Sequence, residues 1–338
     1  MNSPSGWRVH ALRQARHGPP AEVLAWEEIE LPAPGPGEAL VALRAAAIHY
    51  SDLGQINGTY GRLRPLPTVA GREGVGEIVA LGPGVTAPAL GRLVRMPEDA
   101  GVWREAVVTA AADLYPIPPG VPLDQAALAF INPPTAWRLL HDFVTLAPGD
   151  WLAQNAGNSA VGVLVAQLAR HLGWNVLSVV RDVPAHETAL RAAGAAAVVG
   201  EDSGYEKNPA AFTGGAPLRL ALNAVGGESV TRLCRAVAPG GMVVTYGGAS
   251  AEPVRFPTRA LIFNDVVLRG FWLDGWARAQ PAAHVRAGWE QMLALTRDGV
   301  LAQPVAASYP LGEWRAALEH AFRGGRGGKI MFRAGWHP

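Results

Sequence analysis

Hydrophobic and polar positions along the first part of the chain form short runs that glycine and proline interrupt. The segments Gly37 to Tyr50 and Val75 to Gly82 are rich in Val, Ile, Leu and Ala, and the turn-like stretches "PAPGPG" and "GPGVTAP" flank them. Apolar runs between turn residues are typical of strands. A further strand-like run begins at Trp7. The first part of the chain is therefore predicted to be mostly β.

The pattern changes near Asp124, after which strand-like and helix-like segments follow one another. Strands are predicted at Asp150 to Asn155 and Asn175 to Val180, and helices at Ser159 to Gly173 and His186 to Gly194. The stretches "LRLALNAVGG", "GMVVTYGG" and "VVLRGFWL" continue the alternation. Such alternation predicts a parallel sheet with crossover helices, and its pattern is that of a doubly wound, dinucleotide-binding α/β sheet.

The tail from about Gly275 contains two helix-like runs and the strand-like "GKIMF". We expect this tail to return to the first part of the chain. The predicted organisation is a catalytic domain over residues 1–121, a cofactor-binding domain over residues 122–274, and a C-terminal part, residues 275–338, that rejoins the catalytic domain.

Composition narrows the class of protein. The 338 residues are 49% hydrophobic and 17% charged, which suits packed globular domains. The formal net charge is +1 and Lys and Arg form no dense run, so nucleic acid is not an expected partner. The single cysteine, Cys234, rules out an internal disulfide and a Cys-rich zinc site, and it fits a reducing compartment.

The N-terminal stretch "MNSPSGWRVHALRQARHG" lacks the apolar core of a signal peptide. Its arginines and serines are compatible with an organelle transit peptide, but the strand-like run from Trp7 leaves too little room for one. No stretch of the sequence approaches the roughly 20 apolar residues that a membrane span requires. We therefore expect a cytoplasmic protein without a membrane partner.

The turn Asn155 to Gly162 lies between a predicted strand and a predicted helix. Backbone N–H groups and the positive end of a helix at such a turn can hold a pyrophosphate. The usual G-x-G-x-x-G pattern is not met, because Ala160 stands where glycine often occurs, while Gly157 and Gly162 remain. The alternative is an ordinary helix start that Asn158 or Ser159 caps.

In such a sheet, the residues at the end of the second strand indicate whether the protein binds NAD or NADP. An acid there bonds the ribose hydroxyls of NAD, whereas an Arg accommodates the 2′-phosphate of NADP. Here Arg181 precedes Asp182. A guanidinium offers bidentate bonds to phosphate, which favours NADPH; the alternative is an exposed Arg181 with Asp182 as the ribose acid.

Several motifs in order, from about Leu31 to Lys329, carry a family resemblance. They are "SDLGQINGTYG", "GREGVGEIVALG", "INPPTAWRLL", "LAPGDWLAQNAGNSAVG", "VLSVVRD", "LALNAVGG", "MVVTYGGAS" and "LIFNDVVLRGFWLDGW". The chain resembles the medium-chain dehydrogenase/reductase superfamily and, within it, the zinc-free 2-enoyl thioester reductases of the mitochondrial trans-2-enoyl-CoA reductase type. The fold that this implies is a GroES-like, mostly β catalytic domain with a Rossmann cofactor domain.

The resemblance also implies cofactor-binding residues. Asn132 would contact the cofactor near the nicotinamide, and Lys329 near the C-terminus would also reach the cofactor. The other implied contacts are to the pyrophosphate (Asn158, Ser159, Ala160, Val161), to the adenosine 2′-phosphate and ribose (Arg181, Asp182), beside the cofactor at a strand end (Tyr246, Gly247, Gly248) and to the nicotinamide through backbone groups (Phe271, Trp272, Leu273).

The zinc branch of the superfamily has metal ligands that this sequence lacks. The matching positions hold His49, Arg72 and Asn132. A cationic Arg and a missing thiolate do not make a tetrahedral zinc site. We therefore expect no metal, and His49 is interpreted as a pocket or core residue. The resembling family usually has Asn at the position of His49 and often has Asn at that of Arg72.

Without a metal, reduction of a 2-enoyl thioester needs an acid or donor from the protein. The family resemblance assigns this role to the tyrosine of a Q-x-x-G-x-Y loop, which Gln55, Gly58 and Tyr60 preserve. Arg62 and Arg64 would then bind the phosphates of CoA or of a phosphopantetheine arm, or else be solvated loop charges.

Three functions remain open from the sequence. The first is NADPH-dependent reduction of an enoyl-CoA or enoyl-ACP substrate, with hydride to C3 and a proton to C2. The second is a zinc-free NADPH:quinone oxidoreductase, and the third is a non-catalytic NADPH-binding protein of the crystallin type. The resemblance implies a homodimer.

Overall fold

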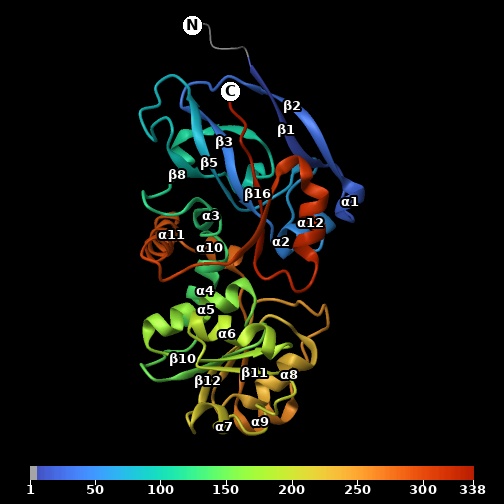
Figure 1. The fold of residues 1–338 in the computed structure, drawn as a ribbon, viewed down its shortest axis with the longest axis vertical. Coiled ribbons are helices and arrows are strands. Elements are labelled where there is room, and N and C mark those ends of the chain that lie inside the picture. The colour runs from blue at the N-terminus through green and yellow to red at the C-terminus, as the bar shows by residue number, and fades with distance from the viewer. Residues whose placement is uncertain (1–5) are drawn as a thin grey trace. The chain divides into compact units, whose positions relative to one another are not determined.

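The computed structural model describes residues 6–338 of the chain. It divides into two compact units, one formed by Met1–Phe130 with Gln303–Pro338 and the other by Ile131–Ala302. Each unit has its own β-sheet structure (Figure 1). Each also buries apolar side chains of its own.

The unit Ile131–Ala302 is built on a six-stranded parallel sheet. Its strands lie in the order β11-β10-β9-β12-β13-β14. This is the order of the doubly wound dinucleotide-binding fold, in which the chain changes direction beside its first strand. The strands are β9 (Trp151–Gln154), β10 (Asn175–Val180), β11 (Ala197–Gly200), β12 (Leu218–Asn223), β13 (Met242–Thr245) and β14 (Val267–Gly270).

Successive residues of these strands enter apolar clusters on opposite faces of the sheet, as the period of a strand requires. Leu152 and Val176 pack with helices α4, α5 and α11, while Ala153 and Leu177 pack with helices α8 and α9. Both faces are thus covered, which explains why the strands read as continuous apolar runs. These helices are α4 (Asn132–His141), α5 (Ala160–Leu172), α8 (Gly227–Ala236), α9 (Thr258–Asn264) and α11 (Ala282–Arg297).

Local signals set several boundaries as predicted. Helix α5 begins after the N-cap Ser159 and ends at Gly173, which adopts a left-handed conformation. Helix α6 (Val183–Ala193) begins earlier than predicted, because Asp182 caps it and a proline occupies its first turn. The remaining helices of this unit are α7 (Ala210–Thr213) and α10 (Leu273–Arg278).

The other unit contains, within the described residues, a three-stranded and a seven-stranded sheet. The small sheet has the order β2-β1-β4, and the large one β15-β16-β3-β5-β6-β8 with β7 paired to β3. The strands are β1 (Gly6–Gln14), β2 (Leu24–Pro32), β3 (Glu38–Ala47), β4 (Thr68–Val69), β5 (Gly74–Leu81), β6 (Leu93–Arg95), β7 (Ala106–Ala110), β8 (Tyr115–Pro116), β15 (Val305–Pro310) and β16 (Lys329–Arg333).

The C-terminal strand β16 lies inside this sheet, between β15 and β3, and pairs with both. Its residue Phe332 packs edge-on against the buried Trp103 at 5.2 Å between ring centroids. The short helical elements of this unit are α1 (Pro20–Val23), α2 (Tyr50–Asn57), α3 (Leu123–Ala126), α12 (Trp314–Phe322) and the 3₁₀ turns η1 (Glu98–Ala100), η2 (Ala111–Asp113) and η3 (Leu311–Glu313).

Helix α2 differs from the sequence-based prediction, which had a strand running to Tyr50. The strand ends at Ala47 and a helix begins at Tyr50. An internal glycine, Gly54, hides this helix in the sequence because glycine disfavours helix interiors. The helix is held by the backbone N–H of His49, which donates to the Asp52 carboxylate at 2.7 Å.

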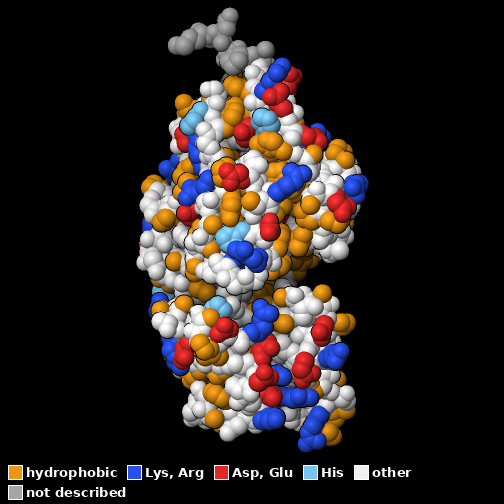
Figure 2. Space-filling model, turned by 45° about the vertical axis from the view of Figure 1, so that its right-hand side comes forward, with side chains coloured by type: hydrophobic (Ala, Val, Ile, Leu, Met, Phe, Trp, Pro, Cys, Tyr) orange, Lys and Arg blue, Asp and Glu red, His pale blue; other side chains and the backbone are white. Residues whose placement is uncertain are grey.

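The surface carries charges of both signs. On the face shown in Figure 2, Lys and Arg side chains are interleaved with Asp and Glu, in keeping with the net charge of +1. Across residues 6–338, no helix combines the length and the apolar character that crossing a bilayer would demand.

Candidate active site

Tyr60 lies in a loop that folds back onto helix α2. The backbone N–H groups of Thr59 and Tyr60 both donate to the carbonyl oxygen of Gly54, at 2.9 and 3.1 Å. A Cβ at Gly54 would lie 3.3 Å from that of Tyr60, so glycine gives the ring room beside the helix. Gly58 ends the helix with a φ of 79°, which glycine adopts readily. The two glycines therefore fix how closely Tyr60 approaches α2.

Gln55 ties the far side of the same loop. Its side-chain amide donates to the carbonyl oxygen of Arg62 at 2.6 Å, and its amide oxygen accepts from the backbone N–H of Arg64 at 3.4 Å. Gln55 thus serves the loop as a clamp, a role that sequence alone does not reveal.

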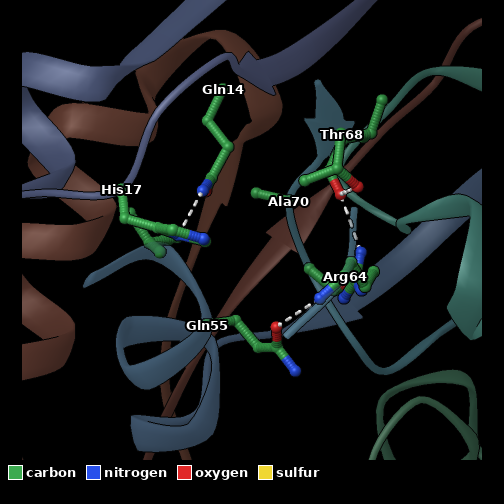
Figure 3. Close-up of a pocket in the computed structure, with 9 residues that line it drawn as sticks. Gln14, His17, Gln55, Arg64, Thr68 and Ala70 are labelled. Atoms are coloured by element: carbon green, nitrogen blue, oxygen red, sulfur yellow. Dashed lines mark hydrogen bonds between the residues drawn. The ribbon is translucent and has the colours of Figure 1, made fainter. Parts of the chain in front are cut away.

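Arg64 is bound to the protein's own backbone. Its two terminal nitrogens each donate to a backbone carbonyl oxygen, that of Val69 and that of Gly71, at 2.7 Å. A small pocket lies beside it, lined on its other sides by Gln14, His17, Gln55, Thr68 and Ala70 (Figure 3). Arg64 therefore joins the Tyr60 loop to the segment that leads to β5. The Arg62 side chain is exposed.

Arg72 contacts Tyr60 directly. Its Nη1 donates to the phenol oxygen at 2.8 Å, and its guanidinium carbon lies 4.7 Å from the centroid of the ring. The opposite edge of the guanidinium donates to Glu98 Oε1 from Nε and Nη2, at 2.9 and 2.7 Å. Burial raises the pKa of Glu98, but Arg72 and Arg95 outweigh it, so the net pKa is lowered.

His49, Glu73 and Lys329 form a buried chain of hydrogen bonds. His49 Nε2 lies 2.6 Å from Glu73 Oε2, and Lys329 Nζ lies 3.0 Å from His49 Nδ1 and 2.8 Å from the carbonyl oxygen of Ile48. An ammonium group only donates, so Nδ1 accepts and Nε2 carries the proton that goes to Glu73. Burial lowers the pKa of Lys329 to about 8, although Glu73 and Asp52 act to raise it.

The positions of the superfamily's zinc ligands do not fit a metal in this chain. Arg72 presents a cation, and His49 is engaged by Glu73 and Lys329. Over residues 6–338, no three His, Cys, Asp or Glu side chains gather where they could hold a metal ion.

In the other unit, the predicted pyrophosphate site is the turn between β9 and α5, where Ser159 caps the helix, as the alternative interpretation also expects. The Ser159 hydroxyl accepts from the Gly162 N–H at 3.1 Å, and Ala160 and Val161 form the first helical turn. A Cβ at Gly157 would lie 2.8 Å from that of Ser178, and one at Gly162 would lie 2.5 Å from a backbone oxygen. These glycines allow close packing at the positive end of a 13-residue helix.

Three of the predicted contact residues beside this turn are exposed, and two of them have internal partners. The side-chain amide of Asn158 lies 3.0 Å from His186 Nε2. Asp182 caps α6 by accepting from the Ala185 N–H at 3.1 Å, which occupies one of its carboxylate oxygens. Arg181 follows directly after β10 and is exposed.

Tyr246 and Phe271 follow neighbouring parallel strands. The Tyr246 N–H donates to the carbonyl oxygen of Asn223, and the Phe271 N–H donates to that of Thr245, both at 2.9 Å. The Tyr246 hydroxyl is buried, and burial raises its pKa although Ser159 acts to lower it.

The remaining predicted cofactor residues lie at element ends. Gly247 and Gly248 continue from Tyr246, and a Cβ at Gly247 would lie 3.0 Å from the Ala224 oxygen. Trp272 precedes Leu273, the first residue of α10, and the Arg278 guanidinium lies over its indole ring at 4.6 Å. Asn132 is buried at the start of α4.

A pair of asparagines at the sheet edge was missed by sequence reasoning. Asn155 donates from its amide to Asn223 Oδ1 at 2.7 Å and accepts from the Ala224 N–H at 2.7 Å. Asn223 Oδ1 also accepts from the N–H groups of Val225 and Gly226. This network ties the ends of β9 and β12, where the strand order reverses and dinucleotides bind in such folds. The repeated ending "LAQN" and "LALN" is the signal that would have indicated it.

Comparison with known proteins places these features in a family context. Residues 35–119 match the alcohol dehydrogenase GroES-like domain, and residues 160–294 match the family described as zinc-binding dehydrogenase. Enoyl-[acyl-carrier-protein] reductase, mitochondrial, from Bos taurus is 41% identical over 318 residues, 92% of this chain and 85% of that protein. The protein of the same name from Homo sapiens is 40% identical over 322 residues, 94% of this chain and 86% of that one.

Solved structures agree with the fold. A complex of Etr1p with NADP and crotonyl-CoA aligns with a TM-score of 0.87 at 27% identity, covering 97% of this chain and 100% of that one. The mitochondrial 2-enoyl thioester reductase Etr1p/Etr2p heterodimer from Candida tropicalis aligns at 0.86 and 28%, with the same coverage. A candidate NADPH:quinone reductase from Bacillus thuringiensis aligns at 0.88 and 27%, again with that coverage. The predicted resemblance and fold class are confirmed.

The comparison also corrects the expected location. The relatives from Bos taurus, Homo sapiens and Mus musculus are named as mitochondrial proteins, so the prediction of a cytoplasmic protein is wrong. That prediction relied on the lack of a secretory signal and of a membrane span, neither of which distinguishes a cytoplasmic enzyme from one that acts inside an organelle. It also set aside a transit peptide because a strand-like run begins at Trp7.

Proposed function

The chain belongs to the family of mitochondrial enoyl-[acyl-carrier-protein] reductases, and from this premise we propose that it reduces the 2,3 double bond of a 2-enoyl thioester with NADPH. One hydride goes to C3 and one proton to C2, which yields the saturated thioester and NADP⁺. The observation that carries the proposal is the Tyr60 loop, docked on α2 by Gly54 and Gln55, in a chain about 40% identical to these reductases.

Tyr60 is proposed as the acid or enolate-stabilising donor of the reaction. Negative charge develops on the thioester oxygen while C3 gains its hydride, so a donor held in the site stabilises that state. A phenol is neutral near pH 7 and donates either a hydrogen bond or a proton. NADPH, when bound, supplies the hydride.

The cofactor is assigned to the unit Ile131–Ala302. The turn and first helical residues Asn158 to Val161 would hold the pyrophosphate, and Arg181 and Asp182 would bind the 2′-phosphate and ribose. The other assigned contacts in this unit are Asn132, Tyr246, Gly247, Gly248, Phe271, Trp272 and Leu273. A cofactor contact of Lys329, which the resemblance implies, stays a prediction. The predicted domain boundaries stay predictions: a catalytic domain of residues 1–121 and 275–338, and a cofactor domain of residues 122–274.

A homodimer is part of the proposal. Strand β14 ends its sheet, and its outer edge offers unpaired backbone groups. Exposed apolar side chains lie on it and on the preceding helix α9: Leu261, Ile262, Phe263 and Val267, between 38% and 70% exposed. An apolar patch next to an open strand edge is the kind of surface that a second copy of the chain covers.

Quinone reduction is the second candidate, because the candidate quinone reductase from Bacillus thuringiensis shares the fold at a TM-score of 0.88. The decisive experiment follows NADPH oxidation with crotonyl-CoA, with crotonyl-acyl carrier protein and with a panel of quinones. Turnover of either thioester that falls roughly 10²-fold or more in Tyr60→Phe supports the proposal. Turnover of quinones alone would replace it with the second candidate, and NADPH binding without any turnover would indicate a binding protein.

A further inference from the structure

Arg72 and Tyr60 come from different segments and meet at the phenol. Tyr60 lies in the loop after α2, and Arg72 lies between β4 and β5. The Arg72 guanidinium both covers the ring and donates to its oxygen at 2.8 Å. We propose that Arg72 is a positioning residue that presents the Tyr60 hydroxyl to the substrate as a hydrogen-bond donor. This inference rests on the proposed function of Tyr60.

The direction of the hydrogen bond supports this role. A guanidinium carries donors only, so in the contact with Arg72 the phenol oxygen must accept. The phenol's own proton is then directed to a different acceptor, which in the proposed reaction is the enolate that forms on the thioester. Arg72 thereby selects the donor orientation of Tyr60 over the orientation in which the hydroxyl would accept from substrate or water.

Arg72 is itself held in one place. It is 2% exposed, and two of its nitrogens donate to Glu98 Oε1. Glu98 is also bound through its other oxygen by Arg95 Nη2 at 3.1 Å. A buried guanidinium with charge-assisted bonds at one edge presents its remaining edge in a fixed direction. The Tyr60 ring and oxygen lie on that remaining edge.

The charges around Tyr60 are mixed, and Arg72 is bonded to the phenol oxygen. Asp52 on α2, Arg64 in the loop, Glu98 on η1 and Arg95 on β6 all interact with this cluster. A cation in direct contact favours the phenolate over the phenol. We therefore expect removal of Arg72 to move the loss of the acid form of Tyr60 to higher pH.

The main test compares Arg72→Gln with Arg44→Gln. Arg44, which is also mostly buried, forms a pair with Glu77 at 3.0 Å, so it controls for loss of an Arg–Glu pair. In Arg72→Gln we expect kcat for crotonyl-CoA to fall at least about tenfold with little change in KM. The pH above which kcat declines, the alkaline limb of the pH profile, should move to higher pH. Arg44→Gln should keep the wild-type kcat and the wild-type alkaline limb.

Two further variants keep the inference testable if Arg72→Gln does not fold. Thermal unfolding will show whether each variant is folded. Glu98→Gln leaves Arg72 in place but weakens its anchor, so a smaller change in the same direction is expected. Arg72→Lys retains the cation but cannot span Glu98 and Tyr60 together, so kcat falls while the pH limb stays near that of the wild type. An unchanged kcat and limb in Arg72→Gln would overturn the inference, as would an equal loss in Arg44→Gln.

A measurement without substrate separates this inference from the proposed function. Ultraviolet difference titration of wild type against Tyr60→Phe reports the Tyr60 phenol, and the same difference taken in the Arg72→Gln background should titrate at higher pH. This shift in a protein that fails to reduce crotonyl-CoA would refute the function and keep the contact. An active enzyme without the shift would refute the role of Arg72.

Discussion

The ammonium nitrogen of Lys329 lies 3.0 Å from Nδ1 of His49, and both side chains are buried. Glu73, on the other side of the imidazole, completes the chain. Burial of the ammonium group costs stability, and this cost is visible in the lowered pKa of about 8 against 10.5 for an ordinary lysine.

The pH dependence of stability follows from that shift. Between about pH 8 and 10.5 the unfolded chain holds the Lys329 proton and the folded chain does not, so stability rises with pH in this window. We expect the free energy of unfolding of the wild type to gain up to about 3 kcal/mol relative to Lys329→Met across it. Urea unfolding of both proteins at several pH values in this window measures the difference. Parallel pH curves would contradict the assigned pKa.

Tyr60→Phe removes only the hydroxyl that the proposed chemistry uses. Turnover of crotonyl-CoA should fall roughly 10²-fold or more, the scale on which general acids contribute. The affinity for NADPH, measured by fluorescence titration, should stay as in the wild type because the cofactor is assigned to the other unit. Unchanged turnover would remove Tyr60 from the mechanism.

Arg181→Ala tests the choice between NADPH and NADH. Loss of a charge-assisted bond to the 2′-phosphate should weaken NADPH binding by about tenfold or more and leave NADH nearly unaffected. Arg297→Ala, which changes another exposed arginine of the same unit, serves as the control. Equal losses for the two cofactors would refute the assignment of Arg181.

Phe263→Glu addresses the proposed dimer. Phe263 is 70% exposed on α9, and a carboxylate buried there would oppose association. We expect light scattering after size-exclusion chromatography to show the monomer mass for this variant and the dimer mass for the wild type. Leu90→Glu changes a side chain that is 61% exposed in the other unit and should leave the dimer intact. A monomeric wild type would end the proposal.

Gly162→Ala tests the close packing under the phosphate turn. The added Cβ would lie 2.5 Å from the Gly157 oxygen, so the helix must shift, at a cost of about 1–3 kcal/mol in the free energy of unfolding. Gly312→Ala, where a Cβ meets nothing within 4 Å, is the matched control. Chemical denaturation of both variants gives the comparison, and equal stabilities would show that the turn tolerates a side chain.

The cofactor unit could be predicted from the sequence because its signals are local. Continuous apolar strands, the small-residue turn after Asn155 and the glycine at the end of α5 each depend on neighbours only a few residues away. Ser159 and Gly173 therefore mark the same helix in the sequence and in the structure. Alternation with helices and right-handed crossovers limit the possible strand orders, but the order β11-β10-β9-β12-β13-β14 comes from the structure alone.

Other features were decided by tertiary structure because their partners lie far apart in the sequence. Lys329 meets His49 only because β16 pairs with β3, which joins residues 280 positions apart. Arg64 looked equally suited to phosphate or to water until the Val69 and Gly71 carbonyls occupied its donors. The sequence by itself determined that a tyrosine stands in a flexible loop. The tertiary structure decided that a buried arginine donates to the oxygen of this tyrosine. The reason is that the pairing of the strands decides which polar groups meet.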